Sequence, residues 1–509
     1  MSAVCAIQDE FSAFSVCREQ FEQLIVGLRS DALAKQTHGE VEAFIQQQGM
    51  ALLRSLLQAY LDRRTHTETR LADVSSPEGR NLNHVRNNEP RQLTTLFGDV
   101  TVRRLSYSQR DEQRQFPLDA ALALPARRYS DGVRRRVVAE AIRGSFDSTC
   151  SSIIQTSGAH IAKRQALQLV QDVAQDFTAF YEQQRYNEPE QTTALLVLSF
   201  DGKGIVMRPD DLREATRRAA TKDEHKLQTR LSQGEKRNRK RMAQVASVYT
   251  VAPHLRHAES VITLGETQNK ESRVCTLPPR ARNKRVWASV ERDAQQVIDE
   301  AFQEALQRDP QQLRPWVVLV DGQPQQRKLI EASIKRFGVK VTLIQDFIHV
   351  LEYLWGAAWC FHDKGDQEAE RWVQERALKL LQGEASQVAA GIRRSATKRK
   401  LKGAARQAAD KCANYLLKNA SRLRYDKALA AGYPIATGVI EGACRHLIND
   451  RLDITGARWR LQGAEAILKL RSLHSSGDWD AYWAFHKQQS TQRLYGHLVL
   501  KKEHAAVSR

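Results

Sequence analysis

Several features that would identify common protein classes are missing from this sequence. No stretch of the 509 residues approaches the roughly 20 consecutive apolar residues of a membrane-spanning helix, and the start, MSAVCAIQDEF, lacks the basic-then-apolar order of a signal peptide. Seven cysteines are scattered without a CxxC pair, which suggests neither a zinc site nor a disulfide framework. These absences predict a soluble, cytoplasmic protein with reduced thiols and no membrane partner.

The chain is strongly basic. Its 78 Lys and Arg residues exceed its 59 Asp and Glu residues, which gives a formal net charge of +19 and a pI near 9.7. A polyanion that binds such a surface releases its own counterions, so nucleic acid is the expected partner. On charge alone, the alternative is a merely basic soluble protein.

The first 90 residues are expected to form a helical N-terminal region. Apolar residues recur three and four apart, which is typical of helices with one buried face. The segment 75–90, SSPEGRNLNHVRNNEP, interrupts this pattern with Pro, Gly and Asn. It therefore predicts a linker.

Residues 91–185 are expected to form a DNA-binding region. Apolar residues around Gly98 and Asp99 predict a β-hairpin. Two later helices, separated by a break at 157–158, match a helix-turn-helix, in which the second helix enters the major groove of DNA. The expected DNA-binding residues at the start of that helix are Lys163 and Arg164. The alternative is an ordinary helical hairpin without a DNA contact.

From residue 192 onward, apolar strands alternate with helices, which predicts an α/β core with a mixed sheet. The first part of this core is expected at 192–361, an α-helical insertion at 362–430, the final core helices at 431–490 and a tail at 491–509. The expected strands are 195–200, 242–251, 260–266, 316–322 and 339–346, and the expected helices are 286–306 and 327–338.

Two of these apolar strands run into a carboxylate. Asp201 and Asp321 each follow a strand and precede a glycine, where strand-to-turn Asp-Gly chemistry is the structural alternative. A Walker-type acid is not indicated, because no GxxxxGK(S/T) loop is present. Two neighbouring carboxylates repel each other, and a divalent cation such as Mg²⁺ or Mn²⁺ neutralises them. Glu441, in the first turn of a helix, is the expected third acid; an exposed pair with Arg445 is its alternative.

The sequence resembles a known family of enzymes. LSFDGKG, VVLVDGQPQ, LIQDFIHVLEYLW and the long segment that begins ATGVIEGACRHLIND look like motifs of the DDE transposases of bacterial insertion sequences, most closely the ISKra-type group. The resemblance implies an RNase H-like mixed five-stranded sheet with a helical insertion, preceded by helical and helix-turn-helix regions. It also implies that Asp201, Asp321 and Glu441 are catalytic and hold two Mg²⁺ (or Mn²⁺) ions. Its expected partners are element ends and target DNA, within a homo-oligomeric synaptic complex associated with the bacterial nucleoid.

The motif QDFIHVLEYLW contributes two further site residues by the same resemblance. Asp346 and His349 would position the catalytic acids through hydrogen bonds, without being metal ligands themselves. The structural alternative is that Asp346 only caps a helix. Glu352 and Glu465 are the substitutes considered for Glu441.

Basic residues outside the helix-turn-helix are also expected to bind DNA. Arg458 and Arg460 flank Trp459, which could stack on an unpaired base, although a buried core Trp is the more usual role. The long connection between the first two strands of the core is expected to grip phosphates with Arg237, Arg239, Lys240 and Arg241. Two other functions stay open: a non-catalytic DNA-binding regulator, and an RNase H-type nuclease without strand transfer.

Overall fold

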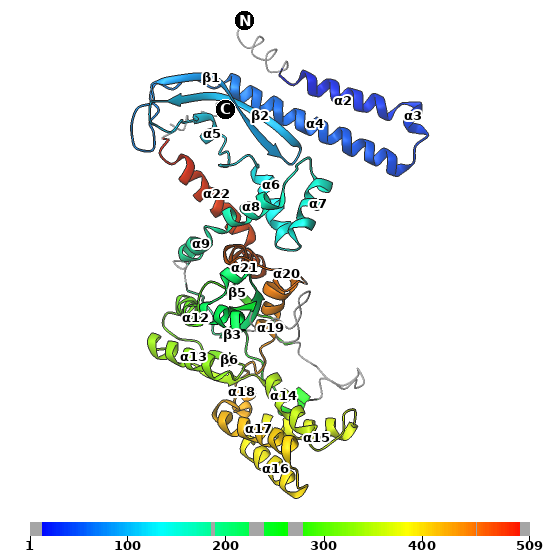
Figure 1. The fold of residues 1–509 in the computed structure, drawn as a ribbon, viewed down its shortest axis with the longest axis vertical. Helices are drawn as coiled ribbons and strands as arrows, with labels where there is room; N and C mark the ends of the chain where they lie inside the picture. The colour runs from blue at the N-terminus through cyan, green and yellow to red at the C-terminus, as the bar shows by residue number, and fades with distance from the viewer. Residues whose placement is uncertain (1–12, 185–188, 223–238, 263–277, 455, 499–509) are drawn as a thin grey trace. The chain divides into compact units, whose positions relative to one another are not determined.

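The structure, a computed structural model, describes residues 13–184, 189–222, 239–262, 278–454 and 456–498 (Figure 1). The chain divides into two compact units. The first comprises Met1–Asp176 and Asp480–Arg509, and the second comprises Phe177–Trp479. Arg237 lies outside the described residues.

The first unit contains a long β-hairpin. β1 (His84–Thr95) pairs antiparallel with β2 (Gly98–Ser108), which confirms the predicted hairpin. Its turn lies at 96–97, so the turn expected at Gly98-Asp99 is wrong by two residues, and both of these residues belong to β2. The prediction of a linker over 75–90 is wrong for residues 84–90, because β2 supplies backbone partners to a segment without a strand pattern of its own. The helices of this unit are α2 (Ser15–Leu28), α3 (Asp31–Ala34), α4 (His38–His66), α5 (Pro117–Ala121), α6 (Asp131–Ala141), α7 (Phe146–Thr156), α8 (Lys163–Ala174) and most of α22 (Trp479–Tyr495).

The helices α6, α7 and α8 share one small core. Val133, Ile153 and Leu169 are buried together at its centre. The break between α7 and α8 contains Gly158, where a Cβ atom would lie 2.6 Å from the backbone of Phe97. Only glycine fits this approach, so the interruption predicted at 157–158 is confirmed and has a packing cause.

The second unit is built on a five-stranded mixed sheet. Its strand order is β5-β4-β3-β6-β7; β4 pairs antiparallel with β3 and β5, and β6 pairs parallel with β3 and β7. The α/β class with a mixed sheet is therefore confirmed. The strands are β3 (Leu195–Val206), β4 (Lys240–Val251), β5 (Arg282–Ser289), β6 (Trp316–Val320) and β7 (Thr342–Gln345).

Side chains along β3 alternate between the two faces of the sheet, as in any strand. Phe200 stacks on Phe302 of α12 with ring centroids 6.3 Å apart. Leu195 and Val197 face the other way, into a core shared with Val350 and other residues of the helices after β7. Asp201 has the parity of Leu195 and Val197, so its side chain belongs to that second face.

Helices cover both faces of this sheet. α12 packs on β3 and β4, whereas α19 packs on β3 and β4 and α21 packs on β5. Within the described part of the chain, no helix has both the length and the apolar character needed to cross a membrane. The helices of the unit are α9 (Phe177–Gln184), η1 (Pro209–Asp211), α10 (Glu214–Lys222), α11 (Ala258–Ile262), α12 (Ala294–Arg308), α13 (Pro324–Phe337), α14 (Phe347–Ala358), α15 (Gln367–Leu381), α16 (Ala385–Lys398), α17 (Gly403–Asn419), η4 (Ala420–Arg422), α18 (Tyr425–Ala430), α19 (Gly438–Cys444), η5 (Arg445–Asn449), α20 (Asp450–Leu452) and α21 (Leu461–Ser476).

Two predicted elements are wrong. Residues 258–262 form α11, so the strand expected at 260–266 is not formed over its described part. The third antiparallel strand is β5, whose residues 286–289 were expected to begin a helix. That helix starts only at Ala294, where Asp293 caps the N–H of Gln296. The apolar residues of β5 fitted a helical spacing by coincidence, whereas the capping residues mark the true start.

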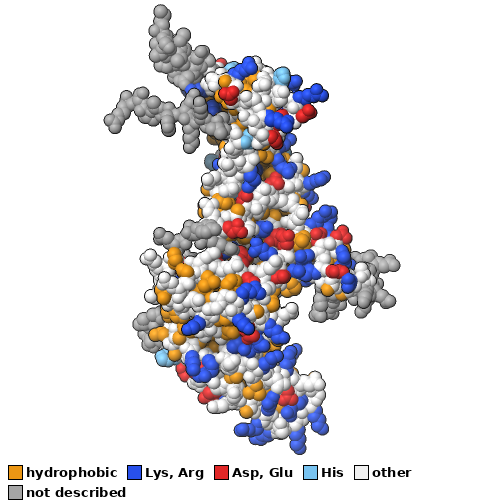
Figure 2. All heavy atoms as spheres, turned by 90° about the vertical axis from the view of Figure 1, so that its left-hand side faces the viewer, with side chains coloured by type: hydrophobic (Ala, Val, Ile, Leu, Met, Phe, Trp, Pro, Cys, Tyr) orange, Lys and Arg blue, Asp and Glu red, His pale blue; other side chains and the backbone are white. Residues whose placement is uncertain are grey.

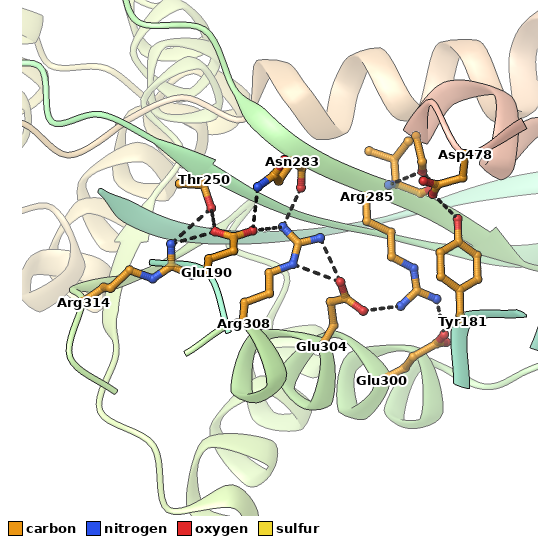
Figure 3. A network of polar contacts seen from close by, with 12 residues as sticks. Tyr181, Glu190, Thr250, Asn283, Arg285, Glu300, Glu304, Arg308, Arg314 and Asp478 are labelled. Carbon is orange, nitrogen blue, oxygen red and sulfur yellow. Dashed lines mark hydrogen bonds and ion pairs between the residues drawn. The ribbon is translucent and has the colours of Figure 1, made fainter. Parts of the chain in front are cut away.

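A buried ion-pair network ties β5 to α12 (Figure 3). Arg285 donates to Glu304 at 2.6 Å and to Glu300 at 2.8 Å, and its guanidinium lies 3.7 Å from the ring centroid of Tyr181. Burial alone would lower the pKa of Arg285, but the two carboxylates outweigh it and hold the pKa above its ordinary value. The network extends through Glu190, which receives Arg308 and Arg314. It lies along the strand starts, away from the predicted acids.

Candidate active site

Asp201 lies inside β3, not at its end. The strand continues to Val206 beside β4, whereas its parallel neighbour β6 pairs only with Leu196–Ser199. The expectation that the strand stops at Asp201 is therefore wrong. Its carboxylate nevertheless lies just past the end of β6, where the sheet opens on one side.

Asp321 follows the last residue of β6 and lies on the same line of the sheet as Asp201. The register of the two strands pairs Leu196 with Trp316 and Ser199 with Leu319, an offset of 120 residues. The spacing of the two acids, 321 − 201 = 120, continues that register. Burial raises the pKa of Asp321, and the like charge of Asp201 raises it further. The two carboxylates are thus close enough to repel.

Asp346 and His349 stand at the start of α14, after β7. Asp346 is fully buried; its Oδ1 accepts the N–H of Ile348 at 3.0 Å, and its Oδ2 lies 2.9 Å from Nδ1 of His349. The hydrogen bond to Asp346 raises the pKa of His349 to about 9, against the effect of burial. Asp346 therefore caps a helix and also holds a histidine; the expected role of the two residues in support of the catalytic acids stays a prediction.

Glu441 enters from α19, which Thr437 precedes. The Thr437 hydroxyl lies 3.3 Å from Oε1 of Glu441 and also contacts Oδ2 of Asp346, which links the two acids. Arg445, the expected surface partner of Glu441, is instead 3.8 Å from Asp450. It begins η5, a π-helical turn of the kind often found at functional sites.

Cys444, on α19, connects Glu441 to Asp201. Its thiol donates to Oδ2 of Asp201 at 3.0 Å. Burial raises the pKa of Cys444, and the charge of Asp201 raises it further, so the thiol stays protonated and acts as a donor. The sequence-based reasoning missed Cys444, and its only signal was its position one turn after Glu441.

These contacts gather five of the predicted site residues at one end of the sheet. In the part of the chain that the structure describes, the group whose ligand atoms all lie within 4.8 Å of one another is Asp346, His349 and Glu441, not the expected trio Asp201, Asp321 and Glu441. Four carboxylates offer hard oxygen ligands and an excess of negative charge, which fits a divalent cation; the imidazole of His349 is a nitrogen donor and can bind a metal only when it is neutral. The mutual repulsion recorded by the pKa of Asp321 fits the same conclusion.

A cavity of about 540 Å³ opens beside Asp201 and Asp321. Three cations line it: Arg213, Lys240 and Arg241. Lys240 lies 3.7 Å from Asp453. The Arg241 guanidinium donates to the carbonyls of Val290 at 2.7 Å, Asp211 at 3.2 Å and Glu291 at 3.4 Å. Arg241 is thus bound to three backbone carbonyls, whereas Arg213 donates to one, that of Arg292 at 3.2 Å, so Arg213 and Lys240 are the less constrained cations of this wall.

A pair of stacked tyrosines connects the insertion to the turn after Asp321. Tyr415 of α17 stacks on Tyr353 of α14 with ring centroids 3.7 Å apart. A Cβ atom at Gly322, the residue after Asp321, would lie 2.8 Å from the Tyr415 hydroxyl and 2.8 Å from Nε2 of Gln345. The Tyr415 hydroxyl and Oε1 of Gln345 are buried without a hydrogen-bond partner among the described residues. No short sequence pattern signals this contact, because Tyr415 follows Asp321 by 415 − 321 = 94 residues.

The remaining predicted residues lie elsewhere. Glu465 is buried and accepts hydrogen bonds from Ser289, Val290 and Glu291. It therefore binds the backbone at the end of β5 and does not replace Glu441. Glu352 is exposed on α14. Trp459 is 7% exposed and donates to the carbonyl of Leu452, as a core residue does. Lys163 pairs with Asp147. The exposed or half-exposed basic residues that remain are Arg164, Arg239, Arg458 and Arg460.

Comparison with known proteins gives limited similarity. Residues 36–243, less than half of the chain, match the family described as "Uncharacterised protein family (UPF0236)". A comparison with curated proteins gave no match. Among solved structures, a chain of the "Drosophila P element transposase strand transfer complex" is similar with 10% identity and a TM-score of 0.24, covering 72% of this chain and 83% of that chain. A TM-score this low supports no assignment of fold or function.

Proposed function

We propose that this protein is a metal-dependent DNA transposase of the DDE type, resembling the ISKra-type group of bacterial insertion sequences. The observation that carries the proposal is the convergence of four carboxylates from β3, β6, α14 and α19 at one open end of the sheet. Asp346 also caps a helix, but the repulsion between Asp201 and Asp321 costs stability, and a helix cap does not require three further acids beside it. They suit a divalent metal at a phosphoryl-transfer site.

The topology supports an RNase H-like catalytic domain. Three antiparallel strands followed by two parallel ones, in the order β5-β4-β3-β6-β7, place the first acid on the central strand and the second after its parallel neighbour. The helices α15 to α18 lie between Asp346 and Glu441 and correspond to the proposed insertion.

Asp201, Asp321 and Glu441 would hold the metal, with Asp346 and His349 close to Glu441. Two bound Mg²⁺ or Mn²⁺ ions would supply activation of the attacking oxygen and charge stabilisation at the leaving 3′ oxygen. The protein's own part is to keep the carboxylates fixed: Cys444 orients Asp201, and Thr437 links Glu441 to Asp346. His349, held by Asp346, presents a positive charge toward the site and can bind a phosphate oxygen.

DNA would be held by basic surfaces on both units. In the second unit, Arg213 and Lys240 line the cavity beside the acids and can bind phosphates there. In the first unit, α7 and α8 would form a helix-turn-helix with Arg164 directed at DNA. A homo-oligomer that brings two element ends together completes the proposal.

The test is cleavage and strand transfer on labelled DNA that carries the flanking ends of the gene. We expect products with Mg²⁺, none with EDTA, and none from Asp321→Asn, which keeps the size of the side chain. Asp363→Asn, at an exposed position on the loop before α15, is the matched control and keeps full activity. Cleavage without joining would favour the RNase H-type nuclease.

A second experiment distinguishes a transposase from a DNA-binding regulator and shows where the metal binds. Fe²⁺ in place of Mg²⁺, with peroxide and ascorbate, cuts the polypeptide next to the bound ion. We expect cuts near Asp201, Asp321 and Glu441, all of them lost on adding excess Mg²⁺. Cuts confined to 346–349 and 441 would assign the ion to the Asp346, His349 and Glu441 group. DNA binding with neither cleavage nor metal-dependent cuts would establish the regulator and refute the transposase.

A further inference from the structure

A second large pocket lies between the edge of the sheet and the helical insertion. Its volume is about 800 Å³, which is within the usual range for ligand sites. One wall is β7, the edge strand, which pairs with β6 only. The other walls come from the start of α16, from η4 and from α18. Every lining residue belongs to the second unit.

The charged residues that line this pocket are all positive. They are Arg422, Arg424 and Lys427, and no Asp or Glu is among the described lining residues. Arg424 is neutralised by Asp426, with nitrogen-to-oxygen distances of 3.1 and 2.7 Å. The carboxylate of Asp426 packs against Gly383, where a Cβ atom would be 2.8 Å away. Two cations, Arg422 and Lys427, therefore remain without a carboxylate within ion-pair distance among the described residues.

Arg422 is held in place although its charge is not neutralised. Its Nη2 donates to Oδ1 of Asn419 at 2.7 Å and to the carbonyl of Lys418 at 3.3 Å. Its Nε is buried and has no hydrogen-bond partner among the residues that the structure describes. Burial lowers the pKa of Arg422, and the positive charge of Arg327 acts in the same direction. The more distant charge of Glu331 opposes these two effects, but no carboxylate among the described residues lies within ion-pair distance of Arg422. A guanidinium fixed in this way is prepared for an anion.

Other features of the pocket also suit a phosphate. Ser421 and Ser386 add hydroxyl groups, and Ser386 lies in the first turn of α16, a 14-residue helix without a side-chain cap, whose free N–H groups attract anions. Tyr433 gives the pocket an aromatic side. Figure 2 shows Lys and Arg side chains gathered at the lower end of the view, where the helices of the insertion lie, so the face of the insertion seen there favours anions.

We propose that this pocket binds a phosphate group, held by Arg422 and Lys427 and by the hydroxyl groups of Ser421 and Ser386. Its wall includes Ile344, two residues before Asp346, or roughly 7 Å of strand from that one acid. A DNA strand that leaves the acids can therefore reach it. The assignment of the phosphate to DNA rests on the proposed function, whereas the phosphate chemistry does not.

The experiment measures binding without catalysis. Full-length protein carrying Asp321→Asn is titrated in EDTA with a fluorescent single-stranded oligonucleotide and, separately, with inorganic pyrophosphate. The pocket variant is Arg422→Gln with Lys427→Gln. The matched control is Arg371→Gln with Lys379→Gln, which removes two exposed charges from α15 outside the pocket. Circular dichroism verifies that both variants fold.

We expect the pocket variant to bind the oligonucleotide about tenfold more weakly than the control, as for the removal of charge-assisted hydrogen bonds. Its salt dependence should weaken by about 0.7 in log–log slope for each phosphate that the variant no longer neutralises. If only pyrophosphate binding is abolished, the pocket takes a free phosphate compound, and its assignment to DNA is refuted. Equal behaviour of pocket and control variants with both probes overturns the proposal. Absence of cleavage by the unmodified protein would refute the proposed function alone, because this measurement requires no cleavage.

Discussion

Replacing Gly322 by alanine tests whether the turn after Asp321 is fixed by the insertion. Gly322 has φ of 92°, which costs an L-residue about 1–2 kcal/mol. The added Cβ would also lie 2.8 Å from both the Tyr415 hydroxyl and Nε2 of Gln345, and overpacking of this kind costs about 1–3 kcal/mol more. We therefore expect the free energy of unfolding to fall by about 2–5 kcal/mol, the sum of these two effects, with loss of DNA cleavage because Asp321 shifts.

Gly338 provides the matched control. It also has positive φ, 62°, but a Cβ atom there would meet nothing within 4 Å. Urea denaturation should show Gly338→Ala losing only the backbone cost, with DNA cleavage unchanged. Adding Tyr415→Phe to Gly322→Ala removes one of the two close contacts and should restore part of both stability and cleavage. Equal losses of stability in the two alanine variants, with cleavage retained in both, would refute the conclusion that Tyr415 fixes the turn after Asp321.

Two further predictions concern charge. Since the pKa of His349 is raised from its ordinary value of 6.5 to about 9, the folded form gains stability that is complete below pH 6.5 and lost as pH rises through 9. Urea titrations in EDTA should show this loss in the unmodified protein and not in His349→Gln; parallel curves would contradict it. Arg285→Met removes the buried cation that Glu300 and Glu304 share, although Arg292 still pairs with Glu300 and Arg308 with Glu304; it should lower the free energy of unfolding by up to about 3 kcal/mol, the lower end of the cost of breaking a buried ion pair. Arg218→Gln, which breaks an exposed pair with Glu214, should cost under about 0.5 kcal/mol, and a similar loss in both variants would show that the network of Figure 3 adds no stability.

Local patterns were sufficient to predict most of the sheet. The apolar runs before Asp201 and Asp321 predicted β3 and β6, and β4 and β7 were also identified, because buried strands leave a continuous apolar signature. The sequence misled at β5, whose apolar residues also fit a helix. The pair Asp293 and Gln296 could have corrected this, since it marks the start of α12.

The site was harder to predict than the sheet, because its contacts join distant parts of the chain. Thr437 and Gly438 indicated that Glu441 would lie in a first helical turn, and it does. The hydrogen bond from Cys444 to Asp201 joins residues 243 positions apart. The contact of Tyr415 with Gly322 joins the insertion to the turn after β6. Neither contact produces a periodic pattern in the sequence. The metal-ligand set stays a prediction, because Glu441 is closest to Asp346 and His349 in the described structure.

The position of the insertion has a consequence for the order in which the site assembles. Glu441 follows Asp346 by 441 − 346 = 95 residues, and closing a loop of that length as a disordered chain costs about 4 kcal/mol in entropy. The helices α14 to α18 share one buried core with β3 and β6, so their folding closes the loop in advance. During synthesis, Asp201 and Asp321 emerge first, and the acidic cluster becomes complete only after the insertion has folded. A chain that ends before Glu441 therefore has an incomplete set of acids, and under the proposed function it would not cut DNA.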